Sequence, residues 1–545
     1  MLKQPYQTLT NLGIALVGGI LMGLTPAPVN AWWLAWIALV PLWVLVINHP
    51  SRIKQCTLLG LAWGIGYHGL ALSWITGVHP MTWMGVPWLA SLAIALFCWL
   101  FITLWGAVLP ALWAGIMVLA HVSLKRSQTP LRFQIGYRVL IGVGAWCGLE
   151  WLWGFGPLLW TSLSYTQSPY NLVILHLGQI SGPTTVTAAL IAVNGFMAEA
   201  WLHRDQSWQL NLGEKPYTLP LHRKSLGLAV GLFVSLHLIG LGLYLRPLNQ
   251  TPDSAFKVGI IQGNVPNEIK LYPAGWRKAI EGYTTGYNTL AEQGVEAVLT
   301  PETALPFFWT EFQQHQSSFY QAILNQKVTA WVGALGSQGR SITNSLFTIN
   351  GQGQVLSQYN KVKLVPLGEY IPFEDFLGRF IDRLSPLDAH MVAGQPRQTF
   401  DTPLGRAIVG ICYESAFAEH FRYQTANGGE FILSPSNDAH YSDAMPAQHH
   451  AQDVMRAIES DRWTVRATNT GYSGIVDPHG RTQWLSQLHI YELHAATIYR
   501  RQTQTLYVRW GDWLTPLLAG LGFMVWIANF AVSRSQNRAR LSSLD

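Results

Sequence analysis

The chain carries two kinds of hydrophobic pattern. Its first 246 residues contain long, nearly uninterrupted apolar runs, whereas residues 255–500 contain short apolar runs separated by polar and amphipathic stretches. A helix needs about 20 predominantly apolar residues to cross a bilayer. The pattern therefore predicts eight membrane spans, seven before the polar region and one after it, at 10–27, 30–48, 56–78, 88–118, 137–158, 172–200, 225–245 and 512–532.

The polar region alternates between strand-like and helix-like segments. Short β-branched or apolar runs predict strands at 257–262, 297–300, 329–334, 345–349, 355–359, 406–411, 431–433, 464–467 and 474–477. Amphipathic stretches predict helices at 274–293, 310–326 and 446–460. The Asn-Gly-Gln-Gly sequence at 350–353 is typical of a hairpin turn.

Such alternation predicts a layered α/β domain outside the membrane, large enough for a core of its own. The expected division of the chain has four parts. They are seven spans within 1–246, an extramembrane domain at 247–511, an eighth span at 512–533 and a tail at 534–545.

The composition indicates that the first part of the chain lies in lipid and most of the second part in water. Of 545 residues, 49% are apolar and only 12% are charged, which is too apolar for an ordinary soluble protein. Only four of the 29 acidic residues precede position 247, namely Glu150, Glu199, Asp205 and Glu214. The net charge of +6 suits anionic membrane surfaces and gives no reason to expect a nucleic-acid partner.

The basic residues predict the orientation in the membrane. Lys and Arg gather in alternate loops, near 52–54, 125–138 and 204–224, and in the tail, whereas the intervening loops have none. Loops rich in Lys and Arg stay in the cytoplasm. Both termini are therefore expected in the cytoplasm of a bacterial inner membrane, and the polar domain in the periplasm. A span count wrong by one would invert the domain.

One cysteine lies in the polar region. Cys412 follows the apolar run 407–411, which reads as a buried strand, whereas the other three cysteines lie in apolar runs. The end of a strand presents side chains to a cleft, so Cys412 is a candidate nucleophile. The alternative is a small cysteine buried in the core, which is the commoner fate of an isolated cysteine.

Two further strand ends carry ionisable residues. Glu302 follows the strand at 297–300, Lys361 follows the strand at 355–359, and Glu369 lies in the next loop. A thiolate attacks a carbonyl far better than a thiol, and the resulting oxyanion needs positive charge or N–H donors. With Cys412, these residues supply a nucleophile, a base and a cation for acyl transfer. Each alone is more often solvated or ion-paired.

The sequences around these residues resemble known motifs. Pro-Glu-Thr at Glu302, Tyr-Asn-Lys at Lys361 and Ile-Cys-Tyr-Glu at Cys412 resemble the Glu-Lys-Cys triad of the nitrilase superfamily. The segments 361–369, 263–266 and 436–438 resemble, more narrowly, the apolipoprotein N-acyltransferase family. These are inner-membrane enzymes that complete bacterial lipoprotein maturation. With the predicted order of spans, the resemblance covers nearly the whole chain.

The resemblance implies a fold and a reaction. The fold would be a four-layer αββα sandwich on a bundle of eight helices, with no cofactor and no metal. In a ping-pong reaction, Cys412 would take an acyl chain from the sn-1 ester of a phospholipid, typically phosphatidylethanolamine. The thioester would then acylate the N-terminal amine of a diacylglyceryl-cysteine on an apolipoprotein. Glu302 would be the general base, and Lys361 would stabilise the oxyanion with the backbone N–H after the cysteine.

The family also implies supporting residues. Glu369 would tune the triad, and Tyr413 and Glu414 match residues that the family needs beside the nucleophile. We expect a monomer. Either Leu271 or Tyr272 stands where the family usually has an aromatic residue, His440 where it commonly has a tryptophan, and Lys363 where it often has histidine. Leu271 and His440 are therefore substrate-binding candidates, and these departures leave the acyl donor and the substrate preference open.

Other candidates have equally good structural explanations. Phe307, Phe308 and Trp309 would either line an acyl entrance or anchor the core. Glu150, in an apolar run, would either be structural or hold a lipid headgroup. His440, His449 and His450 fit no complete zinc-ligand spacing, so no metal is expected.

Two other functions stay open at the level of sequence. One is a membrane-tethered nitrilase-type amidase or hydrolase that uses water as acceptor. The other is a membrane binding protein whose nitrilase-like domain has no catalytic role. The complete set of Glu302, Lys361 and Cys412 argues against the second.

Overall fold

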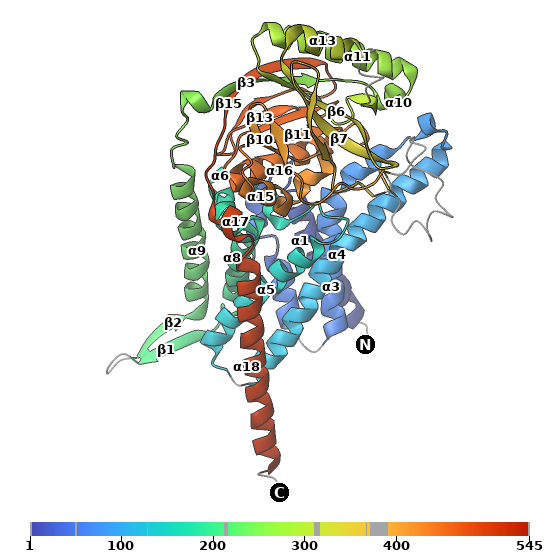
Figure 1. Cartoon of the computed structure of the whole chain (residues 1–545). Helices are drawn as coiled ribbons and strands as arrows, with labels where there is room; N and C mark the ends of the chain where they lie inside the picture. Colours follow the sequence, from blue (N-terminus) through green and yellow to red (C-terminus); the bar gives the residue numbers. More distant parts are fainter. Residues whose placement is uncertain are drawn as a thin grey trace.

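Helices build one half of the protein and two β-sheets build the other (Figure 1). The computed structural model describes residues 3–49, 52–127, 129–211, 216–309, 317–366, 368–370 and 391–542. Both chain ends lie at the end of the helical half that faces away from the sheets (Figure 1).

Each predicted span contains helix. The long helices are α1 (Lys3–Gly23), α3 (Ile53–Ala71), α4 (Trp88–Arg126), α5 (Leu131–Trp153), α8 (Pro183–Leu202), α9 (Leu221–Tyr244) and α18 (Leu514–Ser542). Within the described residues, four helices are long and apolar enough to cross a membrane, namely α4, α8, α9 and Leu514–Val532 of α18. The helical region with several apolar helices is confirmed, and the count of eight spans stays a prediction.

The second and sixth predicted spans are wrong as single helices. The second consists of a 3₁₀ helix (Trp32–Trp36) followed by the nine-residue α2 (Val40–Asn48). The sixth begins with two four-residue helices, α6 (Leu172–Leu175) and α7 (Gly178–Ser181). Only α8 after them is long, because Gly182 at φ 71° reverses the chain and a proline then opens the next helix.

Helix α4 is longer than the membrane requires. Its 39 residues rise about 58 Å at 1.5 Å each, nearly twice the ~30 Å hydrocarbon core. Its N-terminal end rises beside the sheets (Figure 1). The predicted span at 88–118 therefore covers only part of the helix.

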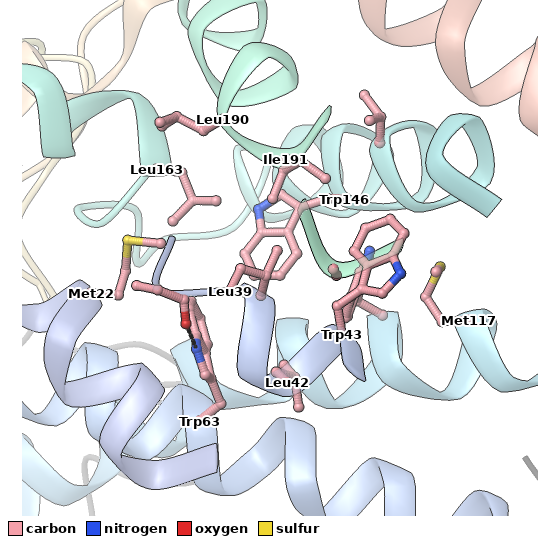
Figure 2. Close-up of a cluster of buried hydrophobic side chains, with 14 of the residues drawn as sticks. Met22, Leu39, Leu42, Trp43, Trp63, Met117, Trp146, Leu163, Leu190 and Ile191 are labelled. Carbon is pink, nitrogen blue, oxygen red and sulfur yellow. Dashed lines mark hydrogen bonds between the residues drawn. The ribbon is translucent and has the colours of Figure 1, made fainter. Parts of the chain in front are cut away.

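Tryptophan side chains fill the core of the helical half. Trp43, Trp63 and Trp146 are almost wholly buried, and Figure 2 shows them packed among leucine, isoleucine and methionine side chains from several helices. Small residues let the backbones approach: a Cβ on Gly19 of α1 would lie 1.9 Å from the Trp63 carbonyl oxygen of α3. Close packing of this kind holds helices together where lipid removes the hydrophobic driving force.

The other half contains two sheets. The first has the order β15-β3-β4-β6-β7-β8, with β5 beside β6, and the second has the order β14-β13-β12-β11-β10-β9. The strands of the first are β3 (Ala255–Gln262), β4 (Ala297–Leu299), β5 (Leu305–Phe308), β6 (Thr329–Gln338), β7 (Ser341–Ile349), β8 (Val355–Asn360) and β15 (Glu492–Tyr499). The strands of the second are β9 (Phe400–Thr402), β10 (Gly405–Val409), β11 (Phe431–Ser436), β12 (Thr464–Thr468), β13 (Gly474–Val476) and β14 (Thr482–Leu485).

All nine predicted strands of the polar region are confirmed, as is the hairpin turn, which joins β7 to β8. Helices α11 (Pro273–Glu292) and α16 (Ala444–Ser460) are also confirmed. The third predicted helix is α13 (Ser318–Gln326), and positions 310–316 of that prediction lie outside the described residues. The eight-residue β15 was missed, as were a short hairpin of β1 (Ser207–Asn211) and β2 (Pro216–Pro220) and helix α15 (Ala418–Ala426).

The two sheets face each other across one core. Val258 and Leu299 of the first sheet pack with Val409, Leu433 and Val465 of the second. Helices α11 and α13 pack on the outer side of the first sheet, and α15 and α16 on the outer side of the second. Helix α16 also packs against the helical half, so the second sheet is the one nearer to the bundle.

Candidate active site

Cys412 occupies a strained turn at the end of β10. It opens a short 3₁₀ helix (Cys412–Ala416) with φ 52°, an unusual value for a residue with a side chain. Strain of this kind persists where the surrounding structure holds it in place, and it clusters at active sites. Burial, reinforced by the charge of Glu302, raises the pKa of the Cys412 thiol well above its usual range. The thiol therefore needs a base before it can attack.

Glu302, Lys361 and Glu369 form one buried ionic cluster. The Lys361 Nζ lies 2.8 Å from Oε1 of Glu302 and 2.9 Å from Oε2 of Glu369. Asn344 of β7 bridges the two carboxylates, because its Nδ2 donates to Glu302 at 2.7 Å and to Glu369 at 2.8 Å. We call these four residues the front cluster. Asn344 was missed, since its partners lie far away in sequence.

The charges of the front cluster stabilise one another. Burial alone would raise the pKa of Glu302, but the charge and hydrogen bond of Lys361 hold it below its ordinary value. Burial alone would lower the pKa of Lys361, but Glu302 and Glu369 raise it well above its ordinary value. At neutral pH Glu302 is thus a carboxylate, Lys361 an ammonium and Cys412 a neutral thiol. Glu302 can accept the proton that Cys412 must lose.

Glu414 connects the turn at Cys412–Ala416, which we call the cysteine turn, to residues 361–363, which we call the lysine segment. Its carboxylate accepts hydrogen bonds from the backbone N–H groups of Ile411 at 2.7 Å, Val362 at 2.6 Å and Lys363 at 3.1 Å. The Tyr359 hydroxyl donates to the same carboxylate at 3.0 Å. One buried side chain therefore fixes the ends of β8 and β10 relative to each other.

Tyr413 connects the same turn to the helical half. Its hydroxyl accepts from the Leu159 N–H at 2.9 Å and donates to the Pro157 carbonyl at 2.8 Å. Its ring stacks on that of Trp160, with centroids 6.2 Å apart. The candidate site therefore rests directly on the loop between α5 and the next helical segment.

A second lysine lies in the wall of the site. Lys270 is buried, and its Nζ donates to the Glu302 carbonyl at 3.2 Å and to the Thr303 hydroxyl at 2.9 Å. Burial lowers its pKa to about 8. Its neighbour Leu271, the predicted substrate-binding candidate, is half-buried, and Lys270 itself was not predicted.

His440 lies at the rim formed by the same segment. It is exposed, and its ring is within hydrogen-bond distance of the Asn267 amide, 2.6 Å from Nδ1. The two loops that depart from the family pattern therefore touch each other.

The three aromatic candidates after Glu302 divide between two environments. Trp309 is buried, stacks against Phe307 and meets Tyr320 of α13, so it belongs to the core on the outer side of the first sheet. Phe307 packs against the same core, and Phe308 is half-buried. This packing favours the alternative of a core anchor for Trp309, and a role at an acyl entrance stays a prediction.

Glu150 is saturated with hydrogen bonds. Its carboxylate accepts from Trp146 Nε1 at 3.2 Å, the Ser162 hydroxyl at 3.1 Å, the Leu163 N–H at 2.9 Å and the Thr187 hydroxyl at 3.0 Å. These donors come from α5, α8 and the loop that contacts Tyr413. The structural explanation for Glu150 is favoured over headgroup binding.

One cluster has the residue types of a metal site. The potential ligand atoms of Cys412, Asp438 and His449 lie within 4.8 Å of one another. Both ring nitrogens of His449 are engaged, because Nδ1 lies 3.0 Å from Asp438 Oδ1 and Nε2 lies 2.8 Å from the Cys412 carbonyl. The histidine is therefore committed to hydrogen bonds.

Comparison with known proteins agrees with this site at the level of its class. Residues 257–504, which cover nearly all of the two-sheet domain, match the family of carbon-nitrogen hydrolases. Residues 18–196 match the N-terminal domain of apolipoprotein N-acyltransferase.

Three relatives named apolipoprotein N-acyltransferase align along almost their whole length. The relative from Nostoc sp. is 60% identical over 93% of this chain and 97% of its own length. Those from Synechocystis sp. and Thermosynechococcus vestitus are 48% and 42% identical, over 93% and 91% of this chain and 98% and 90% of their own. This chain belongs to the apolipoprotein N-acyltransferase family, and its apolar helices are those of a membrane protein.

Proposed function

We propose that this protein transfers an acyl chain from a phospholipid to the N-terminal amine of a diacylglyceryl-cysteine on an apolipoprotein, through a thioester on Cys412. Family membership supports the overall reaction. The observation that carries the chemistry is the buried Glu302–Lys361 ion pair, 2.8 Å long, within electrostatic reach of the strained Cys412.

In the first half-reaction, Glu302 takes the proton of the Cys412 thiol, and the thiolate attacks the sn-1 ester carbonyl. Lys361 and the Tyr413 N–H stabilise the tetrahedral oxyanion. The carbon–oxygen bond of the ester then breaks, and the leaving alkoxide takes the proton from Glu302. A lysophospholipid departs, and the acyl chain stays on Cys412 as a thioester.

In the second half-reaction, the neutral N-terminal amine of the acceptor attacks the thioester carbonyl. Glu302 takes a proton from the amine nitrogen as the carbon–nitrogen bond forms. The carbon–sulfur bond then breaks, and the Cys412 thiolate recovers its proton from Glu302. The enzyme returns to its resting state, and the N-acylated lipoprotein departs.

The supporting residues hold this machinery in place. Glu369 and Asn344 orient Lys361 and Glu302, and Glu414 sets the distance between the lysine segment and the cysteine turn. Tyr413 sets the position of that turn on the helical half. Leu271, His440, Phe307 and Phe308 are proposed to contact substrate at the rim.

We further propose eight spans in a bacterial inner membrane, with a periplasmic four-layer αββα domain at 247–511 between the seventh and the eighth. Both ends of the chain lie away from the sheets in Figure 1, which supports two cytoplasmic termini. Both substrates are lipid-anchored, so a site resting on the helical half suits them. A phosphatidylethanolamine donor and a monomeric enzyme complete the proposal.

Product analysis tests the function. Membranes containing the wild-type protein should yield N-acylated lipoprotein and lysophospholipid, and those containing the Cys412→Ala variant should yield neither. Free fatty acid in place of N-acylated lipoprotein would identify a hydrolase. N-acylation by the Cys412→Ala variant would contradict the proposed route through this cysteine.

A further inference from the structure

A second buried group of charged side chains lies beside the cysteine turn, where His449 contacts the Cys412 carbonyl. Arg466 of β12 bridges two carboxylates, with NH1 2.8 Å from Asp453 Oδ2 and NH2 3.0 Å from Asp438 Oδ2. The other oxygen of Asp438 lies 3.0 Å from Nδ1 of His449. Each of these four residues is at most 2% exposed. We call Asp453, Arg466, Asp438 and His449 the rear network.

The partners of His449 define its protonation. Nδ1 faces a carboxylate and Nε2 faces the carbonyl oxygen of Cys412, and both of these groups only accept hydrogen bonds. Each ring nitrogen must therefore carry a hydrogen, which makes His449 an imidazolium. The rear network then contains two carboxylates, one guanidinium and one imidazolium, so it is neutral. Without the second cation, an unpaired carboxylate would be buried at high cost.

The behaviour of Asp438 agrees with a charged His449. Burial alone would raise the pKa of this carboxyl, but the charges of His449 and Arg466 hold it below its ordinary value. Asp438 is therefore ionised and can anchor the imidazolium ring.

The hydrogen bond from His449 to the Cys412 carbonyl acts on the peptide group that joins Cys412 to Tyr413. The carbonyl of Cys412 and the N–H of Tyr413 belong to the same peptide unit. A cationic donor on the carbonyl polarises the amide and strengthens its N–H as a donor. Among the residues that the structure describes, none accepts a hydrogen bond from this N–H.

The same contact also fixes the plane of that peptide. Cys412 has φ 52°, which lies in the left-handed region of backbone conformation. A strained backbone of this kind persists only where surrounding groups hold it in place. The Cys412 carbonyl, pinned at 2.8 Å by His449, supplies such a constraint.

We propose that His449 is a positioning residue, which orients and polarises the Cys412–Tyr413 peptide so that the Tyr413 N–H binds the oxyanion. This inference rests on the proposed acyl transfer at Cys412. Because both half-reactions pass through a tetrahedral oxyanion, both depend on this N–H. His449 itself touches no substrate.

Two reactions of one thiol separate this role from a structural one. Acylation of Cys412 by a phospholipid ester forms an oxyanion. Alkylation by iodoacetamide displaces iodide from a saturated carbon, so it needs the thiolate and the front cluster but no oxyanion donor. Both rates are measured on the full-length protein in detergent micelles by mass spectrometry of the Cys412 peptide.

The matched variants are His449→Leu, His449→Gln and His450→Gln. Leucine removes both donors, and glutamine keeps a neutral N–H donor. His450 is the adjacent buried residue on α16, and its ring contacts the Thr482 hydroxyl at 2.9 Å, so it serves as control.

We expect His449→Leu to lower the acylation rate about 10²-fold relative to the alkylation rate, with the KM for phospholipid changed less than about threefold. His449→Gln should recover part of the rate, and His450→Gln should behave as wild type. Acylation at the wild-type rate in His449→Leu would overturn the proposal. Equal losses of acylation and alkylation in both His449 variants would also overturn it, since they indicate a structural role.

The wild-type protein separates this test from that of the function. If wild-type Cys412 is alkylated but never acylated by phospholipid, the proposed function is wrong, and the inference that rests on it is wrong as well. If the wild type is acylated and the His449 variants match it, the inference alone fails.

Discussion

The front cluster and the rear network contain the same kinds of residue in different proportions. Each has two carboxylates held by a strong cation, Lys361 in the front cluster and Arg466 in the rear network. The rear network adds the His449 imidazolium, which brings its charge to zero, whereas the front cluster adds the neutral Asn344 and keeps one negative charge. In the proposed mechanism, that surplus charge is neutralised when Glu302 takes the thiol proton. On this proposal, the proportion of cations to carboxylates distinguishes the cluster that accepts a proton from the one that holds geometry.

The largest effect is expected where the front cluster loses its surplus charge. Glu302→Gln keeps the shape but removes the base, so acylation of Cys412 should fall about 10³-fold, within the range for general bases. The rate of thioester formation from phospholipid measures it. The control is Glu281→Gln, the same change at an exposed position of α11, which should leave the rate unchanged. A Glu302→Gln enzyme within about tenfold of wild type would show that the proton goes elsewhere.

A smaller loss of acylation rate is expected at Glu414, which connects the cysteine turn to the lysine segment. Glu414→Gln places an amide where three backbone N–H groups and one hydroxyl now donate, so at least one donor loses its acceptor. The lysine segment should shift, and acylation should fall about 10²-fold, as for misplacement of a catalytic group by about 1 Å. Tyr359→Phe removes only one of these donors and should cost clearly less. An undiminished rate in Glu414→Gln would refute its positioning role.

A still smaller loss of acylation rate is expected at Tyr413, which connects the cysteine turn to the helical half. Tyr413→Phe removes the hydroxyl that bonds both Pro157 and Leu159, leaving the Pro157 carbonyl and the Leu159 N–H without that partner. A loss of about 1–2 kcal/mol is expected, which corresponds to roughly tenfold in acylation if the strain falls on the cysteine turn. Tyr423→Phe on α15 is the control. Loss of thermal stability without loss of rate would separate anchoring from catalysis.

The smallest effect concerns stability alone. Burial raises the pKa of Glu459 on α16 to about 7, although Arg456 lies 2.9 Å away. The folded state therefore binds this proton more tightly than the unfolded chain, so stability falls as the pH rises from about 4.5 to 7.

Glu459→Gln mimics the protonated form. It should raise the midpoint of thermal unfolding by about 2–5 °C at pH 8 and leave it unchanged below about pH 4.5. Scanning calorimetry at several pH values, with Glu281→Gln as control, measures this. A difference that grows toward low pH would contradict the assignment.

Sequence could predict the strands and the three candidate catalytic residues because both depend on local signals. A strand ends where an apolar run meets a polar residue, and Glu302, Lys361 and Cys412 all stand at such points. Asn344 lies inside β7, and its bridge to Glu302 depends on pairing between distant strands. The strand β15 was missed because it mixes charged, apolar and small residues and is mostly half-buried.

The helical half shows the same limit. Apolar runs located every helical region, but they could not distinguish a continuous span from two short helices folded at Gly182. Nor could they show that Glu150 finds four donors, since these come from three separate segments. His449 was considered only as a possible metal ligand, because its proposed positioning role depends on a hydrogen bond to a backbone carbonyl, which the sequence does not show.

Mass analysis of Cys412 after incubation with phosphatidylethanolamine alone tests the central claim most directly. The account predicts that the peptide containing Cys412 gains the mass of one acyl chain, that hydroxylamine removes it, and that added apolipoprotein discharges it. An unmodified Cys412 in a protein that still N-acylates its acceptor would contradict the account.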